Sequence, residues 1–349
     1  MTKSVLVAMS GGVDSSVAAL LLGKKGYDVS GMMLRLWAND AEGTPESEAD
    51  AKRVCDALGI PFSVCDYQRE FKETVIASFI SAYENGETPN PCVTCNRHVK
   101  FEFMLREADK LGIEKIATGH YAKVEYDGER GRYIVKKAAD DKKDQTYMLA
   151  LLTQEQLSRI LFPLGDLTKS EIRELAEENK LASAHKKDSQ DICFIPDGDY
   201  VKFIEEQTKK TYPIGNFTDT FGNVLGTHKG QIRYTTGQRK GLGIALGAPM
   251  YVLRKSTATN EVVLGTNEQL FSDECTVTNL NPIAVSSFTV PFHAEVKIRY
   301  SHKATSAWVY PMDNGNVTVK FDEPQRAVTS GQTAAFYDGD ILLGGGKII

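Results

Sequence analysis

Short apolar runs alternate with helical patterns along the first third of the chain. After Lys3 the sequence reads SVLVAM, a strand pattern, then the polar turn SGGVDSS, then VAALLLGKKG, a helix pattern that ends in glycine. Similar patterns predict strands at 29–36, 60–65 and 113–118, and helices at 46–58, 71–83 and 99–111. Strands that alternate with helices are typical of a parallel sheet covered on both faces, and right-handed crossovers make it doubly wound. The fold class predicted for this part is therefore α/β.

The pattern changes after Gly119, where YAKVEY and RYIVKK flank DGERG and predict a β-hairpin. From about residue 211 the chain consists of short β-type runs separated by turn residues, which is typical of small all-β units. We therefore predict three domains: an α/β catalytic domain at 1–204, a small central β-rich domain at 205–270, and a C-terminal β-barrel at 271–349.

Composition narrows the classes of protein to consider. With 42% apolar and 25% charged residues, the chain has the composition of a folded globular protein. A net charge of -5 argues against nucleic-acid binding through overall positive charge, but it leaves room for a local basic patch. No run approaches the roughly 18 apolar residues of a membrane span, and the N-terminus turns polar too early for a signal peptide. We expect a cytoplasmic protein without a membrane partner.

The turn after the first predicted strand is a candidate phosphate loop. Gly11 and Gly12 let the backbone approach a ligand closely, and Ser10, Asp14 and Ser15 flank them. Backbone N–H groups and the start of the following helix then form a suitable phosphate site. The turn lacks the Gly-Lys-Ser/Thr of a Walker loop and the third glycine of a dinucleotide fingerprint. It suits a pyrophosphate leaving group, although a tight turn that binds nothing is the simpler alternative.

The cysteines form the second candidate for chemistry. Cys92 and Cys95 make a C-x-x-C pair in TPNPCVTCNR, a loop that two prolines stiffen. The loop leads into a predicted helix, and the side chains of Arg97 and His98 lie at its start. Such surroundings favour the thiolate, and so reactive chemistry. Cys193 in SQDICFIP is a third candidate, although it could be a small buried hydrophobe. Structural zinc needs four ligands, and only three candidate cysteines gather here. Cys55, Cys65 and Cys275 are expected to be inert core residues.

Seven sequence motifs, which follow one another along nearly the whole chain, are informative about its family. The SGGVDSS turn resembles the loop of the PP-loop pyrophosphatase family, whose members adenylate a substrate oxygen and release pyrophosphate. Within that family the chain resembles the tRNA 2-thiouridylases, by its segments SGGVDSS, TPNPCVTCNRHVKF, ATGHYA, KDQTYML, SQDICFIPDGDY, TTGQRKGLGI and IRYSHK. The resemblance implies an ATP-dependent sulfurtransferase that activates the C2 oxygen of the wobble uridine of tRNA and replaces it by sulfur.

The resemblance also implies site residues. ATP, accompanied by Mg²⁺, would bind at Ala8, Met9, Ser10, Gly11, Gly12, Val13, Asp14, Ser15, Met33 and Gly119. The target base would lie at Asn90, Pro91 and Cys92, and further tRNA contacts would come from His120, Lys143, Asp144, Gln145, Arg299, Tyr300 and Gln332. Cys193 would carry a persulfide supplied by a donor protein, and Cys95 would be the nucleophile that releases its sulfur. The two thiols would then pair reversibly as a disulfide.

One departure from the family pattern keeps the sulfur route open. Better-known members carry aspartate at the position of Cys92, so the acid/base role assigned to that carboxylate does not transfer. Cys92, Cys95 and Cys193 could instead ligate three irons of a [4Fe–4S] cluster, with the fourth iron open to sulfide. We also expect the segment 186–199, which contains Cys193, to rearrange when tRNA binds.

Two other functions compete with thiolation. One is a PP-loop synthetase that adenylates a small substrate and accepts ammonia, as an amidating ligase does. It would have no use for Cys95 and Cys193. The other is a non-enzymatic, ATP-sensing RNA-binding protein, for which loss of either cysteine would leave tRNA association intact.

Overall fold

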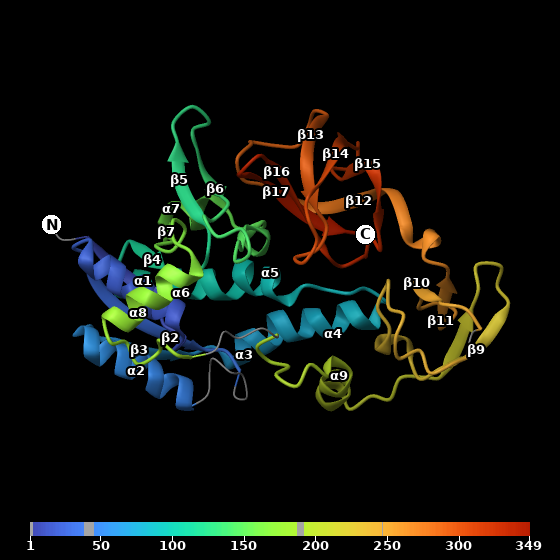
Figure 1. Ribbon diagram of the computed structural model, residues 1–349, viewed down its shortest axis with the longest axis horizontal. Coiled ribbons are helices and arrows are strands. Elements are labelled where there is room, and N and C mark those ends of the chain that lie inside the picture. The colour runs from blue at the N-terminus through green and yellow to red at the C-terminus, as the bar shows by residue number, and fades with distance from the viewer. Residues whose placement is uncertain (1–2, 38–44, 187–191, 246) are drawn as a thin grey trace.

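The computed structural model describes residues 3–37, 45–186, 192–245 and 247–349. The chain forms an N-terminal α/β unit at one end, a barrel beside it, and a small sheet at the far end (Figure 1). Helices α4 and α5 run from the first unit toward the small sheet, beneath the barrel in this view (Figure 1). Among the helices of these residues, none has the length and apolar character that a membrane crossing requires.

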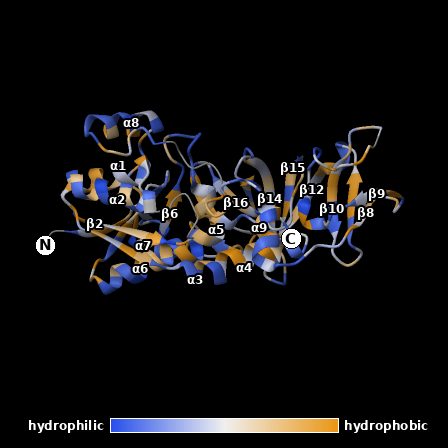
Figure 2. Ribbon diagram, turned by 90° about the horizontal axis from the view of Figure 1, so that it is seen from below, coloured by the Kyte–Doolittle hydropathy of each residue, from blue (hydrophilic) through white to orange (hydrophobic). Residues whose placement is uncertain are grey.

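The first sheet is parallel throughout, with strand order β3-β2-β1-β4-β7. Its strands are β1 (Ser4–Ala8), β2 (Asp28–Arg35), β3 (Phe62–Asp66), β4 (Lys115–Ala117) and β7 (Ile160–Leu161). Figure 2 shows the outer helix α8 as largely hydrophilic. The main covering helices are α1 (Val13–Lys24), α2 (Pro45–Leu58), α6 (Phe101–Lys110), α7 (Gln154–Arg159) and α8 (Lys169–Glu178).

Alternation along β1 explains why both faces of the sheet are covered. Val5 and Val7 pack in one cluster with residues of α1 and α2, such as Leu22 and Val54. Leu6 points to the other face and packs with residues of α6. The predicted doubly wound α/β fold is therefore confirmed.

Two long helical segments contain π-helical turns. The first consists of α3 (Gln68–Phe71), the π turn η1 (Lys72–Ile76) and α4 (Ala77–Glu84). The second consists of α5 (Pro91–Cys95), the π turn η2 (Asn96–Lys100) and α6. Such turns occur frequently at functional sites, and η2 begins directly after Cys95.

The rest of the chain is mainly β-structure. Helix α9 (Tyr200–Thr208) precedes a four-stranded sheet of β8 (Gly215–Thr218), β9 (Val224–His228), β10 (Tyr251–Ser256) and β11 (Glu261–Gly265). The barrel strands are β12 (Phe271–Pro282), β13 (Phe292–Lys297), β14 (Thr305–Pro311), β15 (Val317–Arg326), β16 (Thr333–Asp338) and β17 (Ile341–Ile348). Pairing of β12 with both β15 and β17 closes this barrel. The short 3₁₀ turns are η3 (Thr146–Leu149), η4 (Gln231–Arg233) and η5 (Glu268–Leu270).

The predicted hairpin forms, and it joins the barrel to the α/β unit. Strands β5 (Lys123–Asp127) and β6 (Arg132–Lys136) pair antiparallel around the turn. β6 also pairs with β17, with Leu342 opposite Val135, so the hairpin extends the barrel sheet. A central β-rich unit and a C-terminal barrel were predicted, and both are observed.

Candidate active site

A cavity of about 510 Å³ lies at the carboxyl ends of the parallel strands. This edge of a doubly wound sheet is where such folds bind ligands. Residues predicted for ATP or tRNA that line the cavity are Ala8, Met9, Ser10, Gly12, Val13, Asp14, Ser15, Met33, Gly119, His120, Lys143, Gln145 and Tyr300. Lining residues that were not predicted include Lys100, Thr118, Tyr121, Lys142 and Lys186. One cavity therefore joins the loop of the α/β unit to Tyr300 of the barrel unit.

Hydrogen bonds among the serines and glycines fix the conformation of the loop. The Ser10 N–H donates to Ser15 Oγ at 3.2 Å, and Ser15 Oγ donates to the Gly12 carbonyl at 3.1 Å. Ser16 Oγ donates to the same carbonyl at 2.8 Å. The N-cap residue of α1 is Gly12, which has no side chain that could cap the first-turn amides. These N–H groups are suited to bind an anion at the cavity wall.

Two glycines are required by space and backbone conformation. Gly11 has φ +73, and a Cβ there would lie 2.5 Å from the Ser47 carbonyl oxygen. A Cβ on Gly119 would lie 2.8 Å from the Asp14 carbonyl carbon and the Ser15 nitrogen. Gly119 follows β4, so its lack of a side chain brings the end of this strand against the phosphate loop.

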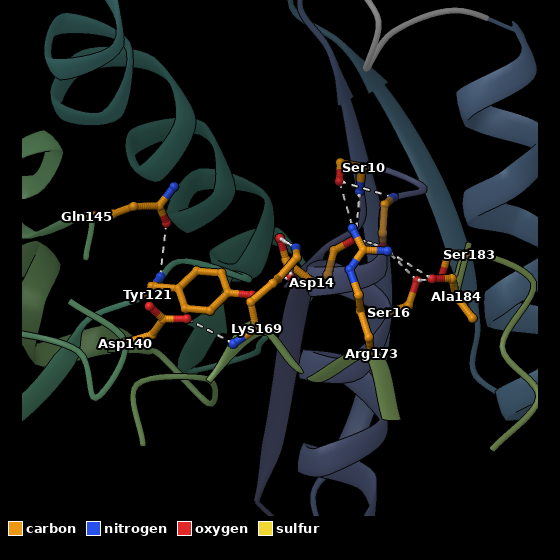
Figure 3. A network of polar contacts seen from close by, with 12 residues as sticks. Ser10, Asp14, Ser16, Tyr121, Asp140, Gln145, Lys169, Arg173, Ser183 and Ala184 are labelled. Atoms are coloured by element: carbon orange, nitrogen blue, oxygen red, sulfur yellow. Dashed lines mark hydrogen bonds and ion pairs between the residues drawn. The ribbon is translucent and has the colours of Figure 1, made fainter. Parts of the chain in front are cut away.

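Asp14 is held by two groups from outside the loop (Figure 3). Tyr121 donates its hydroxyl to Asp14 Oδ1 at 2.7 Å, and Lys169 Nζ lies 2.8 and 2.9 Å from the two carboxylate oxygens. Sequence reasoning missed Lys169. The capping pattern of Thr168 and Glu171 marks the start of α8, but it does not indicate contact with a loop 155 residues earlier.

The loop is also tied to the chain segment that leads toward Cys193. Ser183 Oγ donates to Ser16 Oγ at 2.8 Å, and Arg173 Nη1 donates to the Ala184 carbonyl at 3.4 Å (Figure 3). Lys186 forms an ion pair with Asp50 at 2.9 Å. Residues 187–191, which include the start of the SQDICFIP motif, lie outside the described residues. The expected rearrangement of 186–199 therefore stays a prediction.

His120 is a neutral imidazole in the cavity wall. Burial, together with the nearby Lys100 cation, lowers the pKa of His120 to about 3. Its Nδ1 is hydrogen-bonded to Thr118 Oγ1 at 2.6 Å. At neutral pH this side chain can exchange hydrogen bonds with a ligand, but it adds no positive charge.

The predicted base-contact residues begin helix α5. Asn90 is the N-cap and accepts the Cys92 N–H at 3.2 Å, and Pro91 is the first helical residue, a position that proline favours. Cys92 is half-buried. It lies near the barrel residue Tyr300, whose pKa is raised by burial first and then by the charges of Asp144 and Cys92.

Cys95 and Cys193 belong to one apolar cluster. Cys95 is buried in it, and Cys193 is partly buried against it. Phe194 packs against two other aromatic rings of this cluster. Its ring centroid lies 5.4 Å from that of Phe79 and 5.1 Å from that of Phe203. All six cysteines are thiols in the structure. The described ranges contain no group of three His, Cys, Asp or Glu side chains arranged to hold a metal ion.

The loop before α5 is fixed on the barrel. Gln332 Nε2 donates to the Thr88 carbonyl at 2.7 Å, and the Thr88 N–H donates to the Ser330 carbonyl at 2.9 Å. A Cβ on Gly331 would lie 2.9 Å from Glu87 Cβ. Gln332, predicted as a tRNA contact, thus positions the segment that carries Asn90.

Three other residues predicted to contact tRNA make protein contacts. Arg299 Nη2 donates to the Thr236 carbonyl at 3.2 Å and to the Ala327 carbonyl at 2.9 Å. Asp144 accepts from Thr146 Oγ1 at 2.7 Å, and Gln145 Oε1 accepts the Tyr121 N–H at 2.9 Å. Of these three, only Gln145 lines the cavity. Their roles toward tRNA stay predictions.

A doubly wound sheet whose first turn is an open Ser-Gly-Gly loop defines an α/β protein of the PP-loop class. Family models match the tRNA methyl transferase HUP domain at residues 3–197, the tRNA methyl transferase PRC-barrel domain at 201–266, and the aminomethyltransferase beta-barrel domain at 272–348. The chain belongs to the family of tRNA-specific 2-thiouridylase MnmA proteins.

Two curated relatives span the full chain. The tRNA-specific 2-thiouridylase MnmA of Acetivibrio thermocellus is 50% identical over 99% of this chain and 99% of its own length. That of Clostridioides difficile is 47% identical over 100% of this chain and 98% of its own. A solved U34-tRNA thiolase NcsA from Methanococcus maripaludis, with its [4Fe-4S] cluster, is 19% identical over 59% of this chain and 66% of that chain, with a TM-score of 0.35. That likeness is too weak to transfer the cluster to this chain.

Proposed function

We propose that the protein uses ATP to convert the wobble uridine of tRNA into 2-thiouridine. One observation carries the proposal: a single cavity is lined both by the phosphate loop and by His120, Lys143 and Tyr300, which the sequence motifs predict to contact tRNA. The amidating-ligase alternative has no use for Cys95 and Cys193, which lie in one apolar cluster that reaches the cavity at Leu36. We further propose the division into a PP-loop ATP-binding domain at 1–204, a central domain at 205–270 and a tRNA-binding barrel at 271–349.

ATP would bind with its phosphates at the amides of the first turn of α1 and its adenosine toward Met33 and Gly119. The cavity volume of about 510 Å³ lies in the usual range for ligand sites of this size. Mg²⁺ commonly keeps several waters and is held by substrate phosphates and one or two carboxylates. Mg²⁺ would offset part of the phosphate charge.

The reaction then has two stages. The uridine C2 oxygen attacks the α-phosphorus, pyrophosphate leaves, and the oxygen becomes part of an adenylate. The terminal sulfur of a Cys193 persulfide attacks C2, and AMP leaves with the former C2 oxygen. The Cys95 thiolate attacks Cys193 Sγ, which releases sulfur on C2 and forms a Cys95–Cys193 disulfide. A thiol reductant and a persulfide donor restore the starting state.

Several contacts support this assignment of roles. Cys92 lies near Tyr300, which is 39% exposed and lines the cavity, so a base extruded from the anticodon loop could stack there. Cys95 and Cys193 share a cluster that includes Phe194. A [4Fe–4S] cluster on Cys92, Cys95 and Cys193 is the second route for sulfur.

The test is 2-thiouridine formation on unmodified tRNA with ATP under anaerobic conditions, measured by nucleoside mass spectrometry. Metal-free protein with a persulfide donor is compared with protein reconstituted with iron and sulfide. We expect product from the metal-free protein, and loss of product in Cys95→Ser and Cys193→Ser. Cys65→Ser is the matched control, because it removes a half-buried thiol of β3 that packs against the same cluster, and it should remain active. Product only after reconstitution would favour the cluster, and product in neither case would refute the proposal.

A further inference from the structure

The phosphate loop itself carries a carboxylate, although the ligand proposed for it is an anion. Asp14 lies in the first turn of α1 and lines the cavity. A negative side chain is stabilised at a helix N-terminus. Here, however, the Asp14 carboxylate would share the N-terminus of α1 with the phosphates of ATP. An uncompensated carboxylate at this place would repel the phosphates, and the loop has no Walker lysine to offset the repulsion.

Lys169 supplies the compensating charge from another helix. Its Nζ lies 2.8 and 2.9 Å from the two Asp14 oxygens, and only 12% of its side chain is exposed. Tyr121 donates to Asp14 Oδ1 from the other side and lines the cavity. Lys169 is not among the cavity-lining residues, so it acts on a ligand through Asp14 (Figure 3).

The position of Lys169 is fixed by the start of α8. The Thr168 and Glu171 capping box defines the first helical turn. The Lys169 N–H donates to Asp140 Oδ2 at 3.0 Å, and its ammonium lies 5.7 Å from the centre of the Tyr121 ring. Ile172, one turn farther along α8, packs in the same apolar cluster as Val13 of α1. The ammonium is therefore held beside the loop before any ligand binds.

From these contacts we infer that Lys169 is a positioning residue for ATP, which neutralises and orients Asp14 so that the loop accepts phosphates. The inference rests on the proposed use of ATP and adds a residue from outside the loop to that site. The role belongs to the pair, so loss of the lysine alone harms binding more than loss of both charges.

The test is a double-mutant cycle on the full chain, read as ATP affinity by titration calorimetry. The variants are Lys169→Met, Asp14→Asn, the double variant, and the conservative Lys169→Arg. Lys210→Met is the matched control, because Lys210 pairs with Glu84 at 2.7 Å and neither residue lines the cavity. Thermal unfolding of each variant separates loss of binding from loss of folding.

We expect Lys169→Met to weaken ATP binding by about tenfold or more, since it leaves a carboxylate uncompensated. The double variant should bind ATP more tightly than Lys169→Met does, because it leaves no uncompensated charge beside the phosphates. Lys169→Arg should restore most of the affinity lost in Lys169→Met, and Lys210→Met should bind ATP normally. A double variant that binds no better than Lys169→Met would overturn the inference, as would a Lys169→Met protein that is folded and binds ATP normally. Failure of the wild type to bind ATP would overturn both this inference and the proposed function. Normal binding without 2-thiouridine formation would refute only the thiolation.

Discussion

Gly119 offers the sharpest structural test of the nucleotide site. In Gly119→Ala the new Cβ would lie 2.8 Å from two backbone atoms of the phosphate loop, the Asp14 carbonyl carbon and the Ser15 nitrogen. Ordinary van der Waals contact begins at 3.4 Å, so β4 and the loop would have to separate by about 0.6 Å. Backbone atoms cannot turn aside as a flexible side chain can, and the loop amides would leave their positions at the cavity wall.

Forced overpacking of this kind costs about 1 to 3 kcal/mol. If the cost falls on the ligand-binding form of the loop, ATP affinity should drop about 5-fold to 150-fold. The assay is ATP titration of the purified variant, together with thermal unfolding to show that it remains folded. Gly23→Ala is the matched control, because a Cβ at Gly23 in α1 meets no atom within 4 Å. That variant should bind ATP normally and be slightly more stable, since alanine favours a helix. Unchanged ATP affinity in Gly119→Ala would refute the reasoning.

Three further predictions concern the cysteines, the cavity histidine and the contact with the barrel. Burial raises the pKa of Cys55 to about 11 and that of Cys275 to about 12, so folded protein treated with iodoacetamide at pH 8 should be alkylated at neither, as peptide mass spectrometry can show. His120 has a pKa of about 3 when folded and near 6.5 when unfolded, so between those two pH values the unfolded state binds more protons. Lowering the pH from 6.5 toward 3 therefore reduces stability, by at most about 1.4 kcal/mol per pH unit. Urea unfolding at several pH values should show a smaller loss in His120→Gln, and an equal loss would contradict this. Gln332→Ala removes the hydrogen bond to Thr88 and should lower the unfolding free energy by about 1 kcal/mol, measured by urea denaturation, whereas an unchanged value would show that the bond contributes nothing.

Local patterns predicted much of the α/β unit. The alternation of strand and helix patterns predicted β1 through α2 to within a few residues, because these elements bury regular apolar faces. The π turns within 68–84 and 91–110 were not predicted, since the same periodicity describes a continuous α-helix. The hairpin was predicted from its turn residues, but its pairing with β17 depends on chain segments about two hundred residues apart.

Some residues of the candidate site could likewise be predicted from local sequence, and others could not. Loop residues such as Ser10 and Gly12 have a local signature, and they line the cavity as expected. Lys169 carries no such signature, because its partner Asp14 is distant in sequence and the pair forms only in the folded chain. Arg299 shows the converse, since its motif indicates a tRNA contact while its guanidinium bonds protein carbonyls.

The central claim is that ATP activates the C2 oxygen of the wobble uridine, and an isotope can follow that oxygen directly. An anticodon stem-loop carrying oxygen-18 at C2 of that uridine would be thiolated by the full chain with ATP and a persulfide donor. The account predicts that AMP carries the label in amounts equal to the 2-thiouridine formed. Unlabelled AMP beside a thiolated product would contradict the adenylation step.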